Sequence, residues 1–277
     1  MIHVIGANGL LASSIFSANK EFNLNQIDRA TYENWWQRSS IKEIRSFFSS
    51  SHGSGTIILI AAGVLDPKAS EEEHLRVNYS LPQNIISATE DLGIRVVTFG
   101  TVSEHFQSQV NTYIRSKKML ADYILSDAVI SKRVTHIRLH TLYGGRAPHE
   151  FMFLGRILHS ISLQLPFEMT NGNQLREYHD VYDVALAIWE ILESGAMGAI
   201  DLSHGAPITL KNLAEYLFNR FDCAGLLRLG ALEEPVSENY ETIFRPHYFY
   251  AKTEFRFSLP AIGDYFDNLL SERKSFL

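Results

Sequence analysis

The apolar residues of this chain fall into short continuous runs that alternate with stretches of helical periodicity. Uninterrupted apolar runs are typical of strands buried on both faces of a parallel sheet. Such runs predict strands at residues 1–5, 56–63 and 94–99, and two stretches that mix apolar and polar residues predict strands at 22–28 and 136–143. Apolar positions at helical spacing predict helices at 13–19, 32–48, 71–92 and 113–125. Strands that alternate with helices imply crossover connections, so the pattern predicts an α/β fold with a doubly wound parallel sheet.

The pattern changes after residue 145, where strands and helices no longer alternate regularly. Helical spacing predicts two helices, at 151–161 and 183–193, and residues 199–203, Ala-Ile-Asp-Leu-Ser, are predicted to form a short strand. A further helix is predicted to begin after Thr209, whose hydroxyl suits an N-cap. The second part of the chain therefore has its own organisation.

No internal repeat, low-complexity tract or linker separates the two parts of the sequence. We therefore expect two interwoven domains rather than two domains in series. The first comprises residues 1–145, with 179–205 returning to it, and the second is a smaller α/β lobe of residues 146–178 and 206–277.

A glycine turn joins the first predicted strand to the first predicted helix. Gly6 and Gly9 would let the backbone turn tightly, and Ala12 would permit close packing of helix on strand. A helix N-terminus after such a turn presents N–H groups and a positive dipole end to a phosphate. The spacing G-x-x-G-x-x-A departs from the G-x-G-x-x-G fingerprint, so an ordinary strand–helix turn is the alternative.

The second predicted strand ends at Asp28-Arg29. In a dinucleotide-binding fold, a carboxylate at this place accepts hydrogen bonds from the adenosine ribose, whereas an arginine accommodates a 2′-phosphate. Asp28 therefore favours NAD, and Arg29 leaves NADP open. A solvated ion pair at a strand end is the structural alternative.

Tyr113 and Lys117 are the strongest candidates for catalytic residues. At spacing i and i+4 at the start of a helix, the two side chains lie on one face. We expect the ammonium to lower the pKa of the phenol toward the range useful for acid–base catalysis. A hydroxyl from the end of the preceding strand would complete the site, with Thr101 the first choice and Ser103 the second.

Composition excludes several other classes of protein. The 277 residues carry a formal net charge of −6, which argues against a nucleic-acid surface. The single cysteine, Cys223, rules out an intramolecular disulfide framework and suits the cytoplasm. The longest apolar run, 56–65, is about half the length that spans a membrane. No histidine shows a metal-ligand spacing such as H-E-x-x-H, so we expect no metal.

The order of these motifs resembles the extended short-chain dehydrogenase/reductases, of the NAD-dependent epimerase/dehydratase and dTDP-4-dehydrorhamnose reductase kind. The matching segments span nearly the whole chain: Gly6-Ala-Asn-Gly9-Leu-Leu-Ala12, Ala61-Ala62-Gly63, Val77-Asn78, Phe99-Gly-Thr101, Tyr113-x-x-x-Lys117, Arg138-x-x-x-x-Tyr143-Gly144, Gln174-x-Arg176-Glu-Tyr-x-Asp-Val-x-Asp183-Val-Ala185, Arg245-Pro246 and Ala251-Lys252. The resemblance implies a Rossmann-type dinucleotide-binding domain, a substrate lobe, a nucleotide-sugar substrate and, in many members, a homodimer.

The resemblance also implies roles for particular residues. Tyr113 would be the catalytic acid/base, Lys117 its partner and ribose contact, and Thr101 the third member. Cofactor contacts would come from Gly6, Asn8, Gly9, Leu10, Leu11, Asp28, Arg29, Ala61, Ala62, Gly63, Phe99, Tyr113, Lys117, His140 and Leu142. Substrate contacts would come from Asn78, Arg176 and Arg245, since guanidinium groups match a diphosphate.

Two departures from the family pattern keep alternatives open. Only about a dozen residues separate Thr101 from Tyr113, where the family usually has a longer loop. Val102-Ser103 replaces the Asp-Glu pair of nucleotide-sugar dehydratases, which argues against dehydration. We expect hydride transfer at a sugar carbon, C4 favoured, by a ketoreductase or an epimerase. The alternative is a non-catalytic, dinucleotide-binding regulatory subunit of the same fold.

Overall fold

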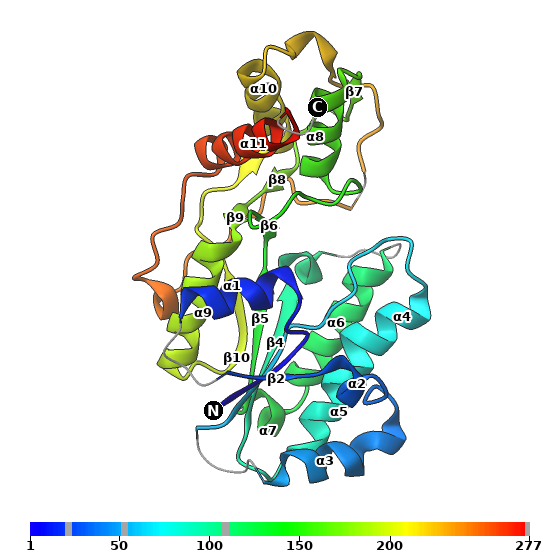
Figure 1. Cartoon of the computed structure of the whole chain (residues 1–277), viewed down its shortest axis with the longest axis vertical. Coiled ribbons are helices and arrows are strands. Elements are labelled where there is room, and N and C mark those ends of the chain that lie inside the picture. The colour runs from blue at the N-terminus through cyan, green and yellow to red at the C-terminus, as the bar shows by residue number, and fades with distance from the viewer. Residues whose placement is uncertain (20–23, 51–54, 107–110, 236, 275–277) are drawn as a thin grey trace. The chain divides into compact units, whose positions relative to one another are not determined.

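The computed structural model describes residues 1–19, 24–50, 55–106, 111–235 and 237–274 (Figure 1). The chain forms two compact units. Unit 1 comprises Met1–Leu139, Ala185–Leu202 and His247–Lys252, and unit 2 comprises His140–Val184, Ser203–Pro246 and Thr253–Leu277.

Residues 247–252, which the sequence analysis assigned to the second lobe, belong to unit 1. Two hydrogen bonds within unit 1 explain this. The Tyr250 hydroxyl donates to the backbone oxygen of Asp201 at 3.0 Å, and the Lys252 N–H donates to the Glu190 carboxylate at 3.0 Å.

Unit 1 is built on a six-stranded parallel sheet, as the apolar runs predicted. Its strands are β1 (Ile2–Ile5), β2 (Leu24–Ile27), β3 (Ile57–Ile60), β4 (Arg95–Thr101), β5 (Val134–Leu139) and β10 (Gly198–Leu202). Their order across the sheet is β10-β5-β4-β3-β1-β2. All four residues of β1 are buried, because helices cover both faces of the sheet. The predicted doubly wound Rossmann-type fold is confirmed.

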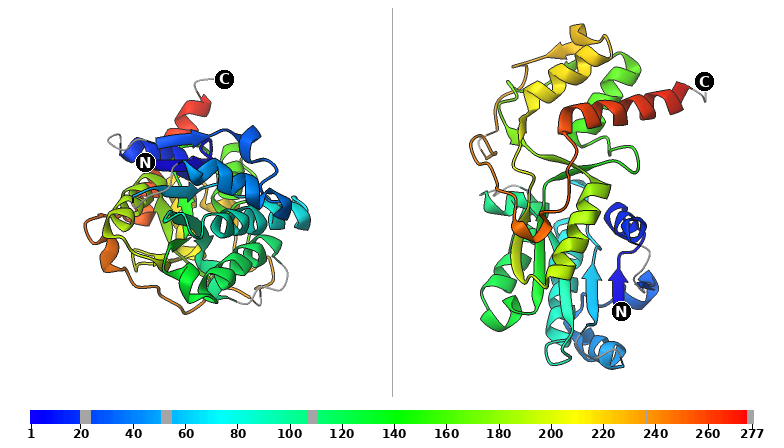
Figure 2. Two further views of the ribbon diagram at one scale, coloured as in Figure 1. Left: turned by 90° about the horizontal axis from the view of Figure 1, so that it is seen from below. Right: turned by 90° about the vertical axis from the view of Figure 1, so that its left-hand side faces the viewer.

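Two layers of helices cover this sheet (Figures 1 and 2). On one side, α3 (Ile41–Ser49), α5 (Leu81–Ala88) and α6 (Thr112–Leu125) pack a continuous apolar core against the strands. On the other side, α1 (Leu10–Ala18) lies beside α9 (Val181–Ser194), where the indole of Trp189 donates to the Ile15 carbonyl at 2.9 Å.

Two of the predicted elements are interrupted. The helix predicted at 71–92 contains a π-helical turn, Arg76–Ser80, between α4 (Glu71–Leu75) and α5. The helix predicted at 32–48 is replaced by α2 (Arg29–Tyr32), a 3₁₀ turn at Arg38–Ser40 and α3.

The strand predicted at 136–143 is also divided. Its first part is β5, and after His140 the chain continues as β6 (Thr141–Tyr143), which pairs with β9 (Tyr178–Asp180) in unit 2. The predicted strand therefore ends in a different sheet from the one in which it begins.

Unit 2 has a separate apolar core, formed mainly by α8 (Phe153–Leu163), α10 (Leu210–Arg220) and α11 (Ser258–Lys274). Three two-stranded sheets accompany these helices: β6 with β9, β7 (Phe167–Glu168) with β12 (Leu227–Arg228), and β8 (Leu175–Arg176) with β11 (Ile208–Thr209). The predicted N-cap is confirmed, since the Thr209 hydroxyl accepts from the Asn212 N–H at 3.0 Å. Among the described residues, no helix is both long and apolar enough to cross a membrane.

Candidate functional site

The strand order of unit 1 reverses between β1 and β3, and ligands of open α/β sheets bind at the carboxyl ends of the strands at such a point. Here Gly6 has a φ of +83°, and a Cβ on it would overlap the backbone nitrogen of Ala62 and lie 2.6 Å from its Cα. The N–H groups of Ala61 and Ala62 both donate to the Ile5 carbonyl, at 2.8 and 3.1 Å. The absence of a side chain at Gly6 therefore lets the two strand ends meet.

Helix α1 begins directly after this turn, with Gly9 as its N-cap. The Gly9 N–H donates to the Gly6 carbonyl at 3.1 Å, which closes the turn. Gly9 has no side chain to cap the helix, so backbone N–H groups of the first turn, from Leu10 onward, can meet an anion. This cradle fits the pyrophosphate of a dinucleotide, and Asn8 lies exposed on its rim.

The acidic and basic pair predicted to read the ribose follows β2, which is the neighbour of β1. Asp28 and Arg29 are both exposed, and the Asp28 carboxylate makes no capping hydrogen bond to α2. Both side chains are thus accessible at the strand end where an adenosine ribose would lie. The sequence favours NAD with NADP not excluded, and the exposed positions of Asp28 and Arg29 do not decide between them.

Lys117 projects from α6 toward the end of β4. Its Nζ donates to the Phe99 carbonyl at 2.8 Å, and a Cβ built on Gly63 would lie 3.6 Å from this Nζ. Burial lowers the pKa of Lys117 to about 8, against an opposing effect of the Glu104 carboxylate. Lys117 therefore joins the ends of β3 and β4 to the helix that carries Tyr113.

The pKa of Tyr113 departs from our prediction. Burial raises this pKa above its ordinary value, and the negative charge of Glu104 raises it further. The expected lowering by Lys117 is wrong, because the ammonium is directed to the Phe99 carbonyl and the half-buried phenol lies near the negative charge of Glu104. Tyr113 is consequently held in its protonated, proton-donating form.

Asn78 lies in the π-helical turn and is buried. Its Oδ1 accepts from the Val64 N–H at 2.9 Å, while its Nδ2 donates to the Val64 carbonyl at 2.9 Å and to the Ser116 hydroxyl at 3.1 Å. These bonds fix the segment that follows β3 against α6. Asn78 therefore positions this segment. The substrate contact predicted for Asn78 stays a prediction.

Thr101 is the last residue of β4 and is half-buried. Its hydroxyl oxygen accepts from the Ser103 N–H at 3.3 Å, which leaves the hydroxyl proton available for donation. Ser103 lies in the 3₁₀ turn Val102–His105 and is also half-buried. Thr101 keeps its place as first choice, because it stands directly at the strand end.

A buried carboxylate that the sequence analysis missed supports this strand end. Glu104 is 3% exposed, and its Oε1 accepts from the Thr101 N–H at 2.8 Å. Arg138 Nε and His136 Nε2 lie 2.7 and 3.2 Å from its Oε2, and these partners hold the pKa of Glu104 at about 2 despite its burial. A Cβ on Gly100 would overlap Glu104 and His136. The only local signal in the sequence was an acidic residue, Glu104, four positions after Gly100.

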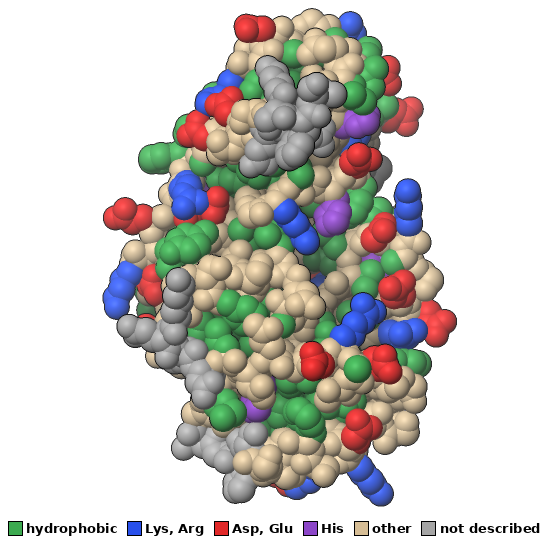
Figure 3. Space-filling model, in the orientation of Figure 1, with side chains coloured by type: hydrophobic (Ala, Val, Ile, Leu, Met, Phe, Trp, Pro, Cys, Tyr) green, Lys and Arg blue, Asp and Glu red, His purple; other side chains and the backbone are tan. Residues whose placement is uncertain are grey.

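The remaining predicted residues lie in unit 2. Arg176 forms an ion pair with Glu238, and Arg245 is exposed. Leu142 is half-buried on β6, and His140 lies beside Glu177. Their cofactor and substrate contacts stay predictions. On the face drawn in Figure 3, Lys and Arg side chains are interspersed with Asp and Glu side chains.

The chain matches the model of the NAD dependent epimerase/dehydratase family over residues 2–201. No curated protein matches it. Among solved structures it is similar to a dTDP-4-dehydrorhamnose reductase from Clostridium acetobutylicum, with 15% identity, a TM-score of 0.72 and coverage of 97% of this chain and 99% of that one.

Two further solved structures are similar over most of both chains. A dTDP-4-dehydrorhamnose reductase from Bacillus anthracis in complex with NADP shares 15% identity, with a TM-score of 0.73 and coverage of 96% and 98%. A UDP-N-acetylglucosamine 4-epimerase from Methanobrevibacter ruminantium, in complex with UDP-N-acetylmuramic acid, shares 14%, with a TM-score of 0.71 and coverage of 100% and 98%. At these identities the likeness supports the fold.

Proposed function

We propose that this chain, which belongs to the NAD dependent epimerase/dehydratase family, is an NAD(P)-dependent ketoreductase or epimerase of a nucleotide-activated sugar. The observation that carries the proposal is the arrangement around α6. This helix presents Tyr113 and Lys117 one turn apart, and the Lys117 bond to the Phe99 carbonyl ties it to the strand that ends at Thr101.

The residues of unit 1 suit a nicotinamide dinucleotide. Gly6, Gly9 and the first turn of α1 would hold the pyrophosphate, and Asp28 or Arg29 would contact the adenosine ribose. When bound, the nicotinamide supplies the site that gives or takes a hydride.

Tyr113 would exchange the proton of the reacting sugar hydroxyl. A raised pKa keeps the phenol protonated, which suits donation to the oxygen of a ketosugar as that oxygen gains charge. Lys117, whose Nζ is fixed by the Phe99 carbonyl, would hold a ribose hydroxyl of the cofactor beside Tyr113. The hydroxyl of Thr101, with Ser103 as the alternative, would donate to the same sugar oxygen.

The substrate would be a nucleoside-diphosphate sugar reacting at C4. Arg176 and Arg245 are the guanidinium groups we assign to its diphosphate, since their planar fork matches phosphate oxygens. One hydride transfer would make the enzyme a ketoreductase, and return of the hydride to the opposite face would make it an epimerase.

Replacement of Tyr113 by Phe tests the assignment. With a panel of 4-keto nucleotide sugars and NADH or NADPH, we expect Tyr113→Phe to lower kcat by about 10²–10⁴-fold, the usual contribution of a general acid. Tyr123→Phe, on the same helix, is the matched control, because the Tyr123 hydroxyl bonds to Ser87 at 3.0 Å and not to the proposed site. Equal activity of Tyr113→Phe and the wild type on a true substrate would refute the mechanism.

The second candidate is a dinucleotide-binding regulatory subunit, which the short stretch between Thr101 and Tyr113 favours. It predicts cofactor binding without turnover of any nucleotide sugar, and co-purification with a partner enzyme. Mass spectrometry of the cofactor carried through purification would decide between NAD and NADP under either candidate.

A further inference from the structure

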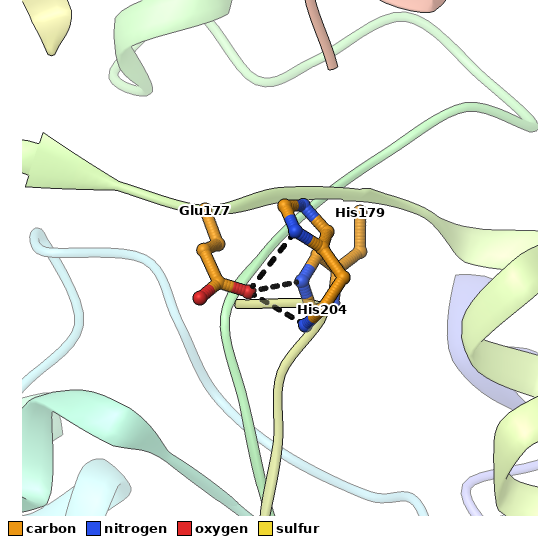
Figure 4. Close-up of side chains that lie close together, drawn as sticks. All are labelled: Glu177, His179 and His204. Atoms are coloured by element: carbon orange, nitrogen blue, oxygen red, sulfur yellow. Dashed lines mark hydrogen bonds and ion pairs between the residues drawn. The ribbon is translucent and has the colours of Figure 1, made fainter. Parts of the chain in front are cut away.

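One glutamate and three histidines form a cluster within unit 2. Glu177 and His179 flank Tyr178 of β9, so their side chains project from the same side of the strand. His204 lies on the segment that follows β10, and His140 directly precedes β6. Figure 4 shows Glu177, His179 and His204 directed toward one another. Three separate segments of the chain therefore supply the cluster.

The imidazole nitrogens converge on one carboxylate oxygen. Oε2 of Glu177 lies 3.0 Å from Nε2 of His179, 3.6 Å from Nδ1 of His204 and 3.8 Å from Nε2 of His140. One ligand atom each from Glu177, His179 and His204 lies within 4.8 Å of the other two. Tetrahedral Zn²⁺ with bonds of about 2.0–2.1 Å separates its ligand atoms by about 3.3 Å, so the spacing suits one such ion.

The cluster contains one buried carboxylate and no permanently charged partner for it among the described residues. Glu177 is 1% exposed, and in the part of the chain that the structure describes its ion-pair partners are imidazoles, with no Lys or Arg among them. A buried carboxylate needs a positive partner or a metal ion. A divalent ion held by neutral imidazoles supplies that charge.

Hydrogen bonds already orient the ligand atoms. Nδ1 of His204 accepts from the Ala206 N–H at 3.1 Å, so this nitrogen carries a lone pair and faces the Glu177 carboxylate as a second acceptor. The other His204 nitrogen, Nε2, lies 3.4 Å from the Ser258 hydroxyl, a contact that favours this tautomer. Nδ1 of His179 is buried and has no hydrogen-bond partner among the described residues.

We propose that unit 2 binds one Zn²⁺ through Oε2 of Glu177, Nε2 of His179 and Nδ1 of His204, with Nε2 of His140 as the fourth ligand. Ligation through Nε2 requires the Nδ1–H tautomer of His179, so its ring proton moves from Nε2 to Nδ1, and Nδ1 of His204 exchanges the Ala206 N–H for the metal. The ion joins β9 to the segments around residues 140 and 204, which is a structural role. Only Glu177 and His179 are close in sequence, and His140 and His204 come from distant segments, so no motif spacing revealed the site and the sequence predicted no metal.

The test uses the untagged, full-length chain, stripped by chelator and titrated with Zn²⁺ alone. We expect one bound zinc per chain by elemental analysis, and a Tm that rises with zinc concentration. Co²⁺ alone should give the intense visible bands of a tetrahedral site. His204→Gln should bind zinc at least about 100-fold more weakly, since even outer-shell changes cost 10–100-fold.

His159→Gln is the matched control, because His159 is an exposed histidine of α8 outside the cluster. It should bind zinc as the wild type does. The proposal is overturned if the wild type retains no zinc and its Tm does not respond, or if His159→Gln weakens binding as much as His204→Gln. If His204→Gln does not fold, the zinc content, the Tm response and the cobalt spectrum of the wild type decide the question.

Discussion

Replacement of Gly6 by Ala should destabilise unit 1 and weaken cofactor binding together. Two features of Gly6 make a side chain unfavourable there: its φ of +83°, and the close approach of the Ala62 backbone. Substitutions at two other glycines allow the two effects to be measured separately. Gly93 has a φ of +64° and open space around its added Cβ, whereas Gly9 has a φ of −73° and a Cβ contact of 3.3 Å with the Gly6 carbonyl oxygen.

The expected magnitudes follow from these geometries. A left-handed conformation costs an Ala about 1–2 kcal/mol, which is the effect expected of Gly93→Ala. A Cβ that must displace backbone adds about 1–3 kcal/mol, so Gly6→Ala should lower the free energy of unfolding by about 2–5 kcal/mol. The Tm should fall by roughly 5–15 °C. Gly9→Ala should change stability by less than about 1 kcal/mol, because its backbone suits any residue.

Tryptophan fluorescence provides an assay specific to unit 1. All three tryptophans, Trp35, Trp36 and Trp189, belong to this unit, so urea or thermal unfolding followed at their emission reports on the sheet that carries the glycine turn. Cofactor affinity is measured by isothermal titration with NAD or NADP. The prediction is refuted if Gly6→Ala and Gly93→Ala have the same free energy of unfolding and Gly6→Ala binds the cofactor with wild-type affinity. The close approach of β1 and β3 would then contribute nothing to stability or binding.

Three further changes test unit 1. The pKa of Glu104 is depressed from an ordinary value near 4.5 to about 2, so its stabilisation is present above pH 4.5 and is lost as the pH falls toward 2. In the wild type, the free energy of unfolding in urea should fall by about 3 kcal/mol across that pH range. Glu104→Gln, which has no carboxyl group at this position, should not show this fall. Asp28→Ala should shift cofactor preference toward NADP and Arg29→Ala toward NAD, each by roughly tenfold in the ratio of Kd values. Unchanged ratios in both variants would show that the end of β2 does not read the ribose.

Much of the fold was predictable because central strands such as β1 and β4 are buried on both faces, which gives each of them a largely apolar sequence. The exceptions have a physical cause. Where the chain passes from β5 to β6 at His140, apolar and polar residues are mixed on both sides of the change, so the hydrophobic pattern alone cannot locate it. The π-helical turn at Asn78 is likewise invisible to a periodicity of 3.6 residues.

The candidate site was predictable only where its residues are close in sequence. Tyr113 and Lys117 share a helix face by local geometry, and Gly6 and Gly9 share a turn. The direction of the Tyr113 pKa was not predictable, because it depends on burial and on Glu104, which comes from another element. Spacing along the chain identifies side chains that can contact one another. Their pKa values depend on burial and on charged residues from other elements of the fold.

Glu104 and Glu177, the glutamates that are buried among the described residues, each accept a backbone N–H but have different charged neighbours. Glu104 accepts the Thr101 N–H and lies 2.7 Å from the guanidinium of Arg138, which carries a permanent positive charge. Glu177 accepts the His204 N–H at 2.8 Å, but its described charged neighbours are imidazoles, which are neutral in at least one accessible state. The same fold thus neutralises one carboxylate with an arginine and surrounds the other with metal-binding side chains. That difference is why we assign a cation to Glu177 and none to Glu104.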